Sequence, residues 1–567
     1  MSQSLIAQIR RSVIGANNEI EGPFGQRLVT YADYTASGRC LSFIEDFLRE
    51  HVLPYYANTH TESSGTGLQT GRFREDARAI IKKLTGCNEE DAVIFCGSGA
   101  TSAINHLVTI LNLRIPRELD NKYNLSEQIP ADERPVVFIG PYEHHSNELP
   151  WRESICDVVV IEEDEDGKPN QALLIEELVR YKDRPLLIGS FSAASNVTGI
   201  GAGTLQISSI LHEHGALSFW DFAAAAPYVD MEMNPECGDA GNYKDAMFIS
   251  PHKFIGGPGT PGILVVKRAL LDNLVPSNPG GGTVAYVGPS EHQYLTDPEQ
   301  REEGGTPDII GAIRAGLVFQ LKDSVGVENI RALEDNFIER AIERWSKNEN
   351  IQILGNPNAW RLSIVSFLVR HKERYLHHNF VVTLLNDLFG IQVRGGCSCA
   401  GPYGHRLLNI DLAQSEAFQR EITRGSEGIK PGWARVNFNY FMSDEEFDYV
   451  LDAIDFVATN GWRFLPLYKF CQISGLWRHR SWKARSAMSL DEVRYVAGTM
   501  TYPHRHAQAH GDCYGKYTDH ANRILADLEN NTFAEAIDDS AVAVVLNEDF
   551  ESLRWFVLPE DLESQSA

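Results

Sequence analysis

The sequence predicts an α/β protein that has a large domain with a mostly parallel sheet between helices, a smaller α+β domain and a C-terminal extension. Between residues 92 and 221, apolar runs of strand length alternate with helical patterns, which is typical of a parallel sheet covered on both faces. A Gly- and Pro-rich turn then separates two apolar runs, at residues 245–249 and 263–266. After Gly280 the pattern changes to long helices and fewer strands, which indicates a second domain.

Four segments are expected along the chain. A short helix with apolar residues on one face opens the first segment. Near the end of the small domain, Ser443 and Glu446 form a capping box, which predicts the start of a helix. The expected bounds are residues 1–24 for the N-terminal helical segment, 25–305 for the large domain, 306–462 for the small domain and 463–567 for the extension.

The expected elements follow from hydrophobic periodicity and turn residues. The large domain is expected to include a polar loop at residues 58–71 and a helix at 72–84, and the charged segment 114–134 is expected to be a surface insertion. Its strands are expected at residues 92–96, 135–139, 157–161, 185–190 and 216–221, and its helices at 101–113, 171–181 and 205–214. In the small domain, helices are expected at 309–323, 327–348 and 379–389, and strands at 362–369, 391–394 and 434–439.

Composition restricts the function classes. The 567 residues carry a net charge of −26, which argues against a nucleic-acid or anionic-membrane surface. No apolar run reaches the length of a membrane span, and the N-terminus lacks the order of a secretory signal. The nine cysteines are scattered, which fits reduced thiols better than a disulfide framework. We therefore expect a cytoplasmic protein that binds neither nucleic acid nor membrane.

Lys253 is the residue around which the candidate chemistry is organised. It lies in the turn at residues 250–262, directly after an apolar strand and next to Ser250 and His252. A lysine amine can form a Schiff base with an aldehyde cofactor, of which pyridoxal 5'-phosphate (PLP) is the usual one. A solvated lysine at a turn is the alternative, so the other parts of a PLP site have to be present elsewhere in the chain.

Candidates for those other parts follow four of the predicted strands. The glycine turn that leads into Gly99, Ala100 and Thr101 opens a helix, and a helix N-terminus presents free N–H groups to a phosphate. Asp221 ends a strand and could keep the pyridine nitrogen protonated, or could merely cap a helix. His144 could stack on the cofactor ring and transfer protons, and Asn196 could donate to the ring hydroxyl. In an open parallel sheet ligands bind beyond the carboxyl ends of strands, so these residues are expected to converge.

Together these motifs resemble those of the class V aminotransferase family of fold-type I PLP enzymes, and most closely its cysteine desulfurase/selenocysteine lyase branch. The resemblance covers roughly residues 25–460 and rests on seven motifs in the family's order. They lie at residues 97–105, 143–151, 195–199, 221, 250–253, 304–307 and 394–400. One position departs from the family pattern: where a glutamine usually follows the aspartate by three residues, this chain has Ala224.

The resemblance implies a role for each site residue. Lys253 would carry PLP and act with His144 in catalysis, Asp221 would pair with the pyridine nitrogen, and Asn196 would contact the ring hydroxyl. Arg435 would grip the substrate carboxylate, as an arginine fork suits such a group. Further contacts to cofactor or substrate are expected from Gly99, Ala100, Thr101, Ser250, His252, Thr306, Asn196 and His60. Because the family's counterpart of Thr306 reaches the partner subunit's cofactor, the resemblance also implies a homodimer.

Cys397 and Cys399 decide the reaction class. They lie on one Gly-rich loop after a predicted strand, and the resemblance selects Cys399 as the sulfur acceptor. Such an acceptor must be a thiolate that can attack the sulfur of bound cysteine. Two cysteines at this spacing could instead be half of a metal site, for which no second pair exists, or could be purely structural; no metal site is expected.

Three functions remain open at this stage. The first is a desulfurase that converts L-cysteine to L-alanine and leaves a persulfide on Cys399, with a protein sulfur acceptor as a further partner. The second is another PLP reaction on an amino acid, such as elimination, epimerisation or transamination. The third is a catalytically silent relative that binds partners through its C-terminal extension. Neither the aromatic segment 477–483 nor the His-rich segment 503–513 of that extension is explained by the resemblance.

Overall fold

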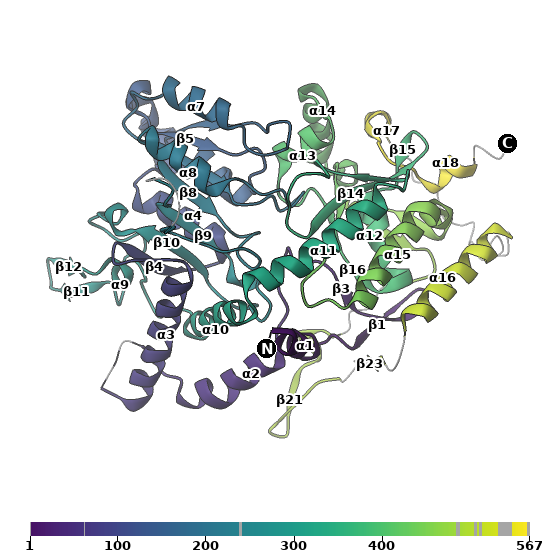
Figure 1. Cartoon of the computed structure of the whole chain (residues 1–567), viewed down its shortest axis with the longest axis horizontal. Helices are drawn as coiled ribbons and strands as arrows, with labels where there is room; N and C mark the ends of the chain where they lie inside the picture. The colour runs from purple at the N-terminus through teal and green to yellow at the C-terminus, as the bar shows by residue number, and fades with distance from the viewer. Residues whose placement is uncertain are drawn as a thin grey trace. The chain divides into compact units, whose positions relative to one another are not determined.

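The computed structural model describes residues 2–59, 61, 63–236, 241–483, 488–503, 507–509, 513–530 and 547–563. The chain forms two compact units (Figure 1). The first comprises residues 1–14, 34–335 and 358–362, and the second comprises residues 15–33, 336–357 and 363–567. The division falls after Asp335, inside a helix, instead of at residue 305 as expected, and the extension groups with the second unit instead of standing apart.

The first unit contains the predicted large sheet. Its strands are ordered β4-β10-β9-β8-β7-β5-β6, and β5 to β9 pair in parallel while β10 runs antiparallel to β4 and β9. The strand bounds are β4 Asp91–Cys96, β5 Val136–Ile139, β6 Asp157–Val160, β7 Leu187–Ser192, β8 Leu217–Asp221, β9 Ala246–Ile249 and β10 Gly262–Lys267. The prediction of a mostly parallel sheet is thus confirmed, and the carboxyl ends of β5, β7, β8 and β9 lie at one edge.

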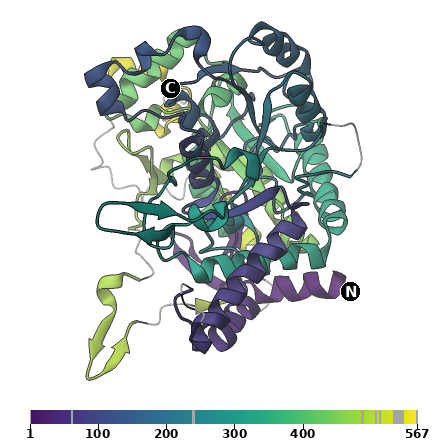
Figure 2. The same cartoon turned by 90° about the vertical axis from the view of Figure 1, so that its left-hand side faces the viewer.

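Helices and a hairpin complete the first unit. Helix α4 packs on β4, β9 and β10, α8 packs on β8, and α10 lies against α3 (Figure 1). The main helices are α1 Ser2–Ser12, α2 Ser42–Phe47, α3 Gly65–Leu84, α4 Gly99–Ile110, α5 Arg117–Tyr123, α7 Gln171–Arg180, α8 Thr204–Glu213 and α10 Ile309–Val325. Strands β11 Val284–Val287 and β12 His292–Tyr294 form a hairpin, drawn in teal, that projects from this unit (Figure 2).

One helix of the first unit begins earlier than predicted. We expected residues 58–71 to be an irregular loop, but α3 starts at Gly65. The Ser64 hydroxyl accepts a hydrogen bond from the Gly67 N–H and caps the helix. The glycines and polar residues of this stretch hid the helix because they lower helix propensity.

The second unit is built on an antiparallel sheet in the order β13-β14-β18-β17. Its strands are β13 Ile351–Ile353, β14 Ile364–His371, β17 Arg394–Gly396 and β18 Trp433–Asn437, with β15 Arg374–Tyr375 beside β14. Its helices are α12 His378–Phe389, α13 Gly401–Leu407, α14 Leu412–Thr423, α15 Asp444–Asn460, α16 Tyr514–Glu529, α17 Glu548–Leu553 and α18 Pro559–Glu563. The predicted cap is present, since the Ser443 hydroxyl accepts from the Glu446 N–H at 3.1 Å.

Residues of the extension help to form the core of the second unit. Smaller pairings surround the main sheet: β1 Asn18–Gly22 with β2 Gly25–Leu28, β3 Thr30–Tyr31 with β16 Ile391–Gln392, β19 Tyr468–Phe470 with β20 Trp477–His479, and β21 Arg494–Val496 with β22 Thr499–Thr501. Trp477, Phe550 and Phe556 are buried with the sheet residues in one apolar cluster. Across the described residues, no helix is both long and apolar enough to cross a membrane.

Candidate active site

Lys253 lies on a tightly held turn between β9 and β10. Its N–H donates to the Ser250 carbonyl at 3.1 Å, and the Gly38 N–H donates to the His252 carbonyl at 2.8 Å. A Cβ on Gly257 would lie 2.0 Å from the Pro251 carbonyl oxygen, so only glycine allows the chain to fold back here. The turn therefore presents Lys253 from a rigid backbone, as predicted from its Gly and Pro content.

The glycine turn after β4 meets the Lys253 turn. Gly99 adopts φ +58°, and a Cβ there would lie 2.9 Å from the Ser250 hydroxyl and 3.0 Å from the His252 ring. The next N–H, that of Ala100, donates to the Ser250 hydroxyl at 2.9 Å. Helix α4 starts at this point, so its free N–H groups lie beside a serine and a histidine. This donor set suits a phosphate.

His252 is neutral in this environment. Burial, followed by the charge of the neighbouring Lys253, lowers the pKa of His252 to about 4. A neutral imidazole carries one N–H donor, which it can offer to an anion.

Asp221 is a buried carboxylate at the end of β8. Its side chain is 4% exposed and accepts from the Ala223 N–H at 2.8 Å. Burial raises its pKa, while the positive charge of Lys253 acts in the opposite direction. A buried carboxylate gains most from a cationic partner such as a protonated pyridine nitrogen.

His144 is oriented by a short polar chain that leads to α4. Its Nδ1 accepts from the Ser146 N–H at 3.1 Å, which puts the proton of the neutral ring on Nε2. The Ser146 hydroxyl lies 3.0 Å from the same nitrogen and 2.7 Å from the Thr101 hydroxyl. The imidazole is thereby fixed relative to the helix start at Gly99.

Glu143 is a feature that the sequence analysis missed. Its carboxyl group accepts from the Ser192 N–H at 2.8 Å, the Ser192 hydroxyl at 2.6 Å and the Asn147 amide at 2.7 Å. Burial, opposed by these hydrogen bonds, raises its pKa to about 7, and the charge of Asp221 contributes. Glu143 ties the loop after β5 to β7 and so fixes the residue next to it, His144. Its position directly before His144 was the available signal.

Asn196 and Ala224 complete the edge of the sheet. The Ser195 hydroxyl accepts from the Val197 and Thr198 N–H groups, both at 3.1 Å, and holds the turn in which Asn196 lies buried. Ala224 is 7% exposed, so the position where the family places glutamine is a buried methyl group here. Its side chain offers no polar contact to a ligand.

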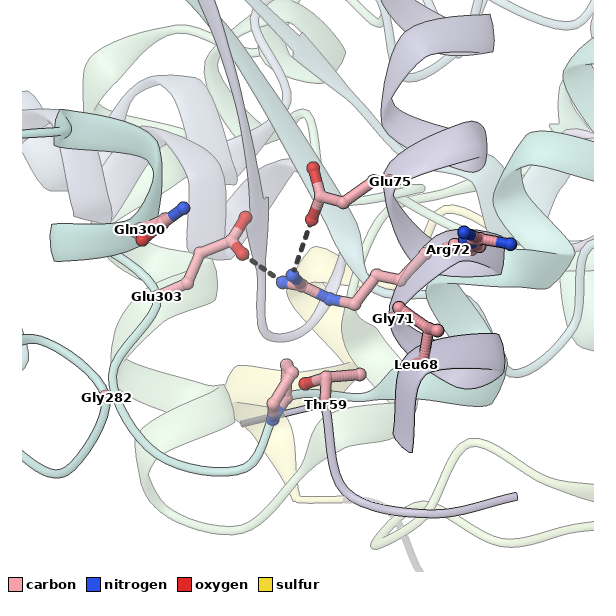
Figure 3. Close-up of a pocket in the computed structure, with 10 residues that line it drawn as sticks. Thr59, Leu68, Gly71, Arg72, Glu75, Gly282, Gln300 and Glu303 are labelled. Carbon is pink, nitrogen blue, oxygen red and sulfur yellow. Dashed lines mark hydrogen bonds and ion pairs between the residues drawn. The ribbon is translucent and has the colours of Figure 1, made fainter. Parts of the chain in front are cut away.

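Thr306 lies on a loop anchored by buried acids. Its hydroxyl accepts from the Asn58 amide at 3.1 Å. Nearby, Glu303 is paired with Arg74 and, at 2.9 Å, with Arg78, and it accepts from the Phe95 N–H of β4. Glu303 and Arg74 line a pocket of about 440 Å³, and Figure 3 shows Glu303, Glu75 and Gln300 around it; its described lining, Pro307 included, contains no predicted PLP ligand. This pocket is therefore separate from the predicted cofactor ligands.

Arg435 lies in the second unit, in the middle of β18. It is 2% exposed and pairs with Asp33 at 2.7 Å. Burial lowers its pKa, and Asp33 opposes that shift. Arg394 of β17 lies directly opposite Arg435 in the antiparallel register. Like charges at such a position repel each other. Asp33 neutralises only one of the two positive charges, so the two arginines are suited to bind a second anion. Arg394 is the second residue whose contribution the sequence analysis missed.

Cys397 and Cys399 lie on a tight turn directly after β17. The Ala400 N–H donates to the Cys397 carbonyl at 3.2 Å, and the two central residues, Ser398 and Cys399, have φ of +50° and +57°. Left-handed values at both positions define a turn that favours Asn and Gly. Non-glycine residues held this way store strain, which gathers at functional sites. Both thiols are partly exposed.

The predicted residues thus fall into two sets. The first unit brings together Gly99, Ala100, Thr101, His144, Asn196, Asp221, Ser250, His252 and Lys253 at the carboxyl edge of its sheet, with Thr306 on a separate loop. The second unit brings together Arg435, Cys397 and Cys399 around β17 and β18. His60, predicted to contact substrate, and His504, His506 and His510 lie outside the described residues. Among those described, no cluster of three or more His, Cys, Asp or Glu side chains is placed to hold a metal.

Comparison with known proteins defines the class. The aminotransferase class-V family matches residues 30–450, so the chain belongs to this family and is a PLP-dependent enzyme. A probable cysteine desulfurase from Halalkalibacterium halodurans is 28% identical over 378 residues, which are 66% of this chain and 84% of that protein. A cysteine desulfurase from Escherichia coli is 27% identical over 380 residues, which are 66% of this chain and 85% of that protein.

Solved structures agree on the fold. The apo structure of a cysteine desulfurase from Thermococcus onnurineus NA1 matches with a TM-score of 0.61 and 23% identity, over 76% of this chain and 95% of that one. The cysteine desulfurase CsdA from Escherichia coli matches with a TM-score of 0.60 and 19% identity, over 79% of this chain and 97% of that one. The fold-type I prediction is therefore confirmed.

The residues of the first unit fit PLP. A Cβ on Gly99 would fill the space beside Ser250 and His252, and this space is bordered by N–H and hydroxyl donors suited to a phosphate. The buried carboxylate of Asp221 would be the charge partner of the cofactor's pyridine nitrogen, and the amine of Lys253 would be the nucleophile for its aldehyde.

Proposed function

We propose that the protein is a cysteine desulfurase that converts L-cysteine to L-alanine and leaves the sulfur as a persulfide on Cys399. One observation carries the proposal: the strained thiol turn directly follows the strand in which Arg394 lies opposite Arg435. The proposed carboxylate-binding arginines therefore lie on β17 and β18, and the proposed acceptor thiol lies on the turn that directly follows β17. The names of the matched relatives support the same reaction.

The first unit would hold the cofactor. PLP, when bound, withdraws electrons from the α-carbon of an amino acid attached to it. We assign the phosphate to Gly99, Ala100, Thr101, Ser250 and His252, the pyridine nitrogen to Asp221, and the ring face to His144. Asn196 would donate to the ring hydroxyl. Lys253 would carry the cofactor and would remove and return the α-proton, with His144 assisting.

The second unit would bind the substrate and take its sulfur. Arg435, held by Asp33 and facing Arg394, would bind the carboxylate of cysteine. The Cys399 thiolate would attack the substrate sulfur, forming an S–S bond while the C–S bond breaks. The electron pair of that bond goes to the carbon side and is protonated. Cysteine and one thiol thereby become alanine and one persulfide, with no external oxidant or reductant.

Partners and place in the cell are further proposals. We infer a homodimer, because Thr306 resembles a residue donated to the partner's cofactor and lies exposed on its anchored loop. We also infer a cytoplasmic enzyme of sulfur metabolism that passes the persulfide sulfur to an acceptor protein. Sedimentation at working concentration tests the dimer, and a monomer would refute it.

A panel of amino acids offered to the holoenzyme tests the function. L-Cysteine should give alanine and sulfide in the presence of a thiol reductant, at a rate well above that with other amino acids. Pyruvate, a keto acid or the D-amino acid as the main product would replace the proposal with elimination, transamination or epimerisation. No turnover with any amino acid, despite bound PLP, would favour a silent binding protein.

A further inference from the structure

The segment at residues 547–563, here the C-terminal segment, is an integral part of the second unit although it lies beyond the family match. Asp549 pairs with Arg424, the residue that directly follows α14, at 2.9 Å, and the Val557 N–H donates to the Tyr375 carbonyl of β15 at 3.0 Å. Phe550 and Phe556 have no exposed surface. The segment therefore packs in a defined position against α14 and β15 within this unit.

Trp555 of this segment covers two buried histidines. Its indole stacks on His377 with centroids 5.4 Å apart at 21°, and on His378 at 5.7 Å and 10°. The indole N–H donates to the Ile429 carbonyl at 3.1 Å. Hydrogen bonding at one end and stacking along the face fix the position of the indole.

His378 in turn touches the backbone that leads to the thiol turn. A Cβ on Gly395 of β17 would lie 3.2 Å from the His378 ring, and a Cβ on Gly432 would lie 2.9 Å from it. The same Cβ on Gly432 would lie 2.8 Å from Cα of Gly396, the last residue of β17. Imidazole and glycine backbone are therefore in direct contact, and β17 cannot shift toward α12 without displacing His378.

A second part of the extension, around Gly475, also contacts a side chain that packs against β17. The side-chain N–H of Asn379 donates to the Gly475 carbonyl at 2.9 Å, and the side-chain oxygen of Asn379 would lie 2.8 Å from a Cβ on Gly395. Residues 378 and 379 open helix α12. Both side chains that back β17 are thus held by residues that follow the family match.

The turn after β17 needs such support. Ser398 and Cys399 both have left-handed backbone angles, a strained conformation for non-glycine residues that persists only where neighbouring structure imposes it. A hydrogen bond from the Ala400 N–H to the Cys397 carbonyl closes the turn. A shift of β17 would remove one end of this closed loop and let the strain relax.

We infer that Trp555 is a positioning residue for the sulfur-accepting thiol: by holding His378 against Gly395 and Gly432, it keeps the strained turn in the conformation in which Cys399 receives sulfur. This inference rests on the proposed function. It gives the C-terminal segment a role in the sulfur-accepting step and none in PLP binding, whose candidate residues all lie in the first unit.

Cysteine reactivity in the PLP-loaded protein tests the inference. Iodoacetamide labelling, followed by peptide mass spectrometry, reports Cys399 directly, with the exposed Cys471 as an internal reference. Trp555→Ala should raise the labelling rate of Cys399 relative to Cys471 by about tenfold, because release of strain opens the turn. Trp555→Phe should stay within about threefold of wild type, since it keeps an aromatic face over His378.

A matched control removes a different aromatic residue of the extension. Tyr495 is 79% exposed on the β21–β22 hairpin, and Tyr495→Ala should leave the labelling of Cys399 unchanged. The absorption of lysine-bound PLP should be the same in all variants. Single-turnover alanine formation should fall with Trp555→Ala while the KM for cysteine changes little.

The result that overturns the inference is equally defined. Labelling of Cys399 within about twofold of wild type in a folded Trp555→Ala protein removes the positioning role. If that variant does not fold, Trp555→Leu is used instead, and hydrogen exchange is measured for the peptide that contains residues 394–400. Exchange equal to that of the wild type would likewise remove the positioning role. Labelling needs no desulfurase activity, so failure of the proposed function would show separately, as loss of alanine formation from cysteine in the wild type.

Discussion

The two units hold their candidate residues in different ways. In the first unit, Gly99 leaves no room for a side chain beside Ser250 and His252, and Asp221 is buried at a strand end. In the second unit, the thiols are partly exposed on a strained turn, whereas Arg435 of the neighbouring strand is buried. A cofactor that stays bound needs a rigid, preformed site, whereas a thiol that takes sulfur and passes it on must remain accessible. This difference predicts that substitutions in the two units produce separable defects.

Lys253→Ala is expected to have the largest effect on activity. It should abolish turnover and the absorption of lysine-bound PLP, because no other amine lies on the turn between β9 and β10. Absorption spectroscopy and a product assay measure both effects. Lys122→Ala, at an exposed lysine of α5, is the control. Normal turnover by purified Lys253→Ala would remove the assignment of the whole first-unit site.

Asp221→Asn should separate cofactor binding from chemistry within the first unit. We expect PLP to remain bound while the rate falls by several orders of magnitude, because the pyridine nitrogen loses its charge partner. Stopped-flow rates under saturating cysteine measure the effect. A rate within about tenfold of wild type, roughly 1.4 kcal/mol of barrier, contradicts the role given to Asp221.

Arg435→Lys should affect substrate binding and leave the cofactor in place. Losing the two-pronged guanidinium should raise the KM for cysteine by about tenfold or more, with a smaller change in kcat. Arg394→Lys is expected to follow the same pattern more weakly, because Arg394 is the more exposed member of the pair. An unchanged KM in Arg435→Lys would move the carboxylate site elsewhere.

Glu143→Gln tests the smallest effect, the pH dependence of the first unit. The folded pKa of about 7 exceeds the ordinary value of 4.5, so the folded state binds this proton more tightly than the unfolded state. Its stabilising contribution is complete below pH 4.5 and is lost as the pH rises through 7, by up to about 3 kcal/mol. The difference in unfolding free energy between wild type and variant should therefore change across this window. A pH-independent difference would show that Glu143 titrates normally.

Sequence patterns predicted which site residues follow the ends of strands, but they did not predict which residues from other elements these side chains contact. Lys253, Asp221, His144 and Asn196 each follow an apolar run, and parallel pairing brings such ends together. The pairing of Arg394 with Arg435 depends on an antiparallel register between residues about forty apart in sequence, which local periodicity does not encode. Glu143 was hidden because its partners, Ser192 and Asn147, come from two different elements.

The extension was the least predictable region. Trp555 and Phe556 lie in a short apolar run without periodicity. Both contact His377, which is almost 180 residues earlier in the chain. Nothing in that local pattern distinguishes a core anchor from an exposed tail. The chain passes from the first unit to the second inside α11 Val327–Trp345, so no break in the helical pattern marks that point in the sequence.

The central claim is that Cys399 receives the sulfur, and one measurement tests it most directly. After a single turnover with L-cysteine, the protein is digested and its peptides are weighed. We expect the mass of one added sulfur on the peptide that contains Cys399, its loss together with alanine formation in Cys399→Ser, and retention of most alanine formation in Cys397→Ser. Alanine and sulfide at the wild-type rate from Cys399→Ser would contradict the account, and loss of activity in Cys397→Ser alone would move the acceptor to Cys397.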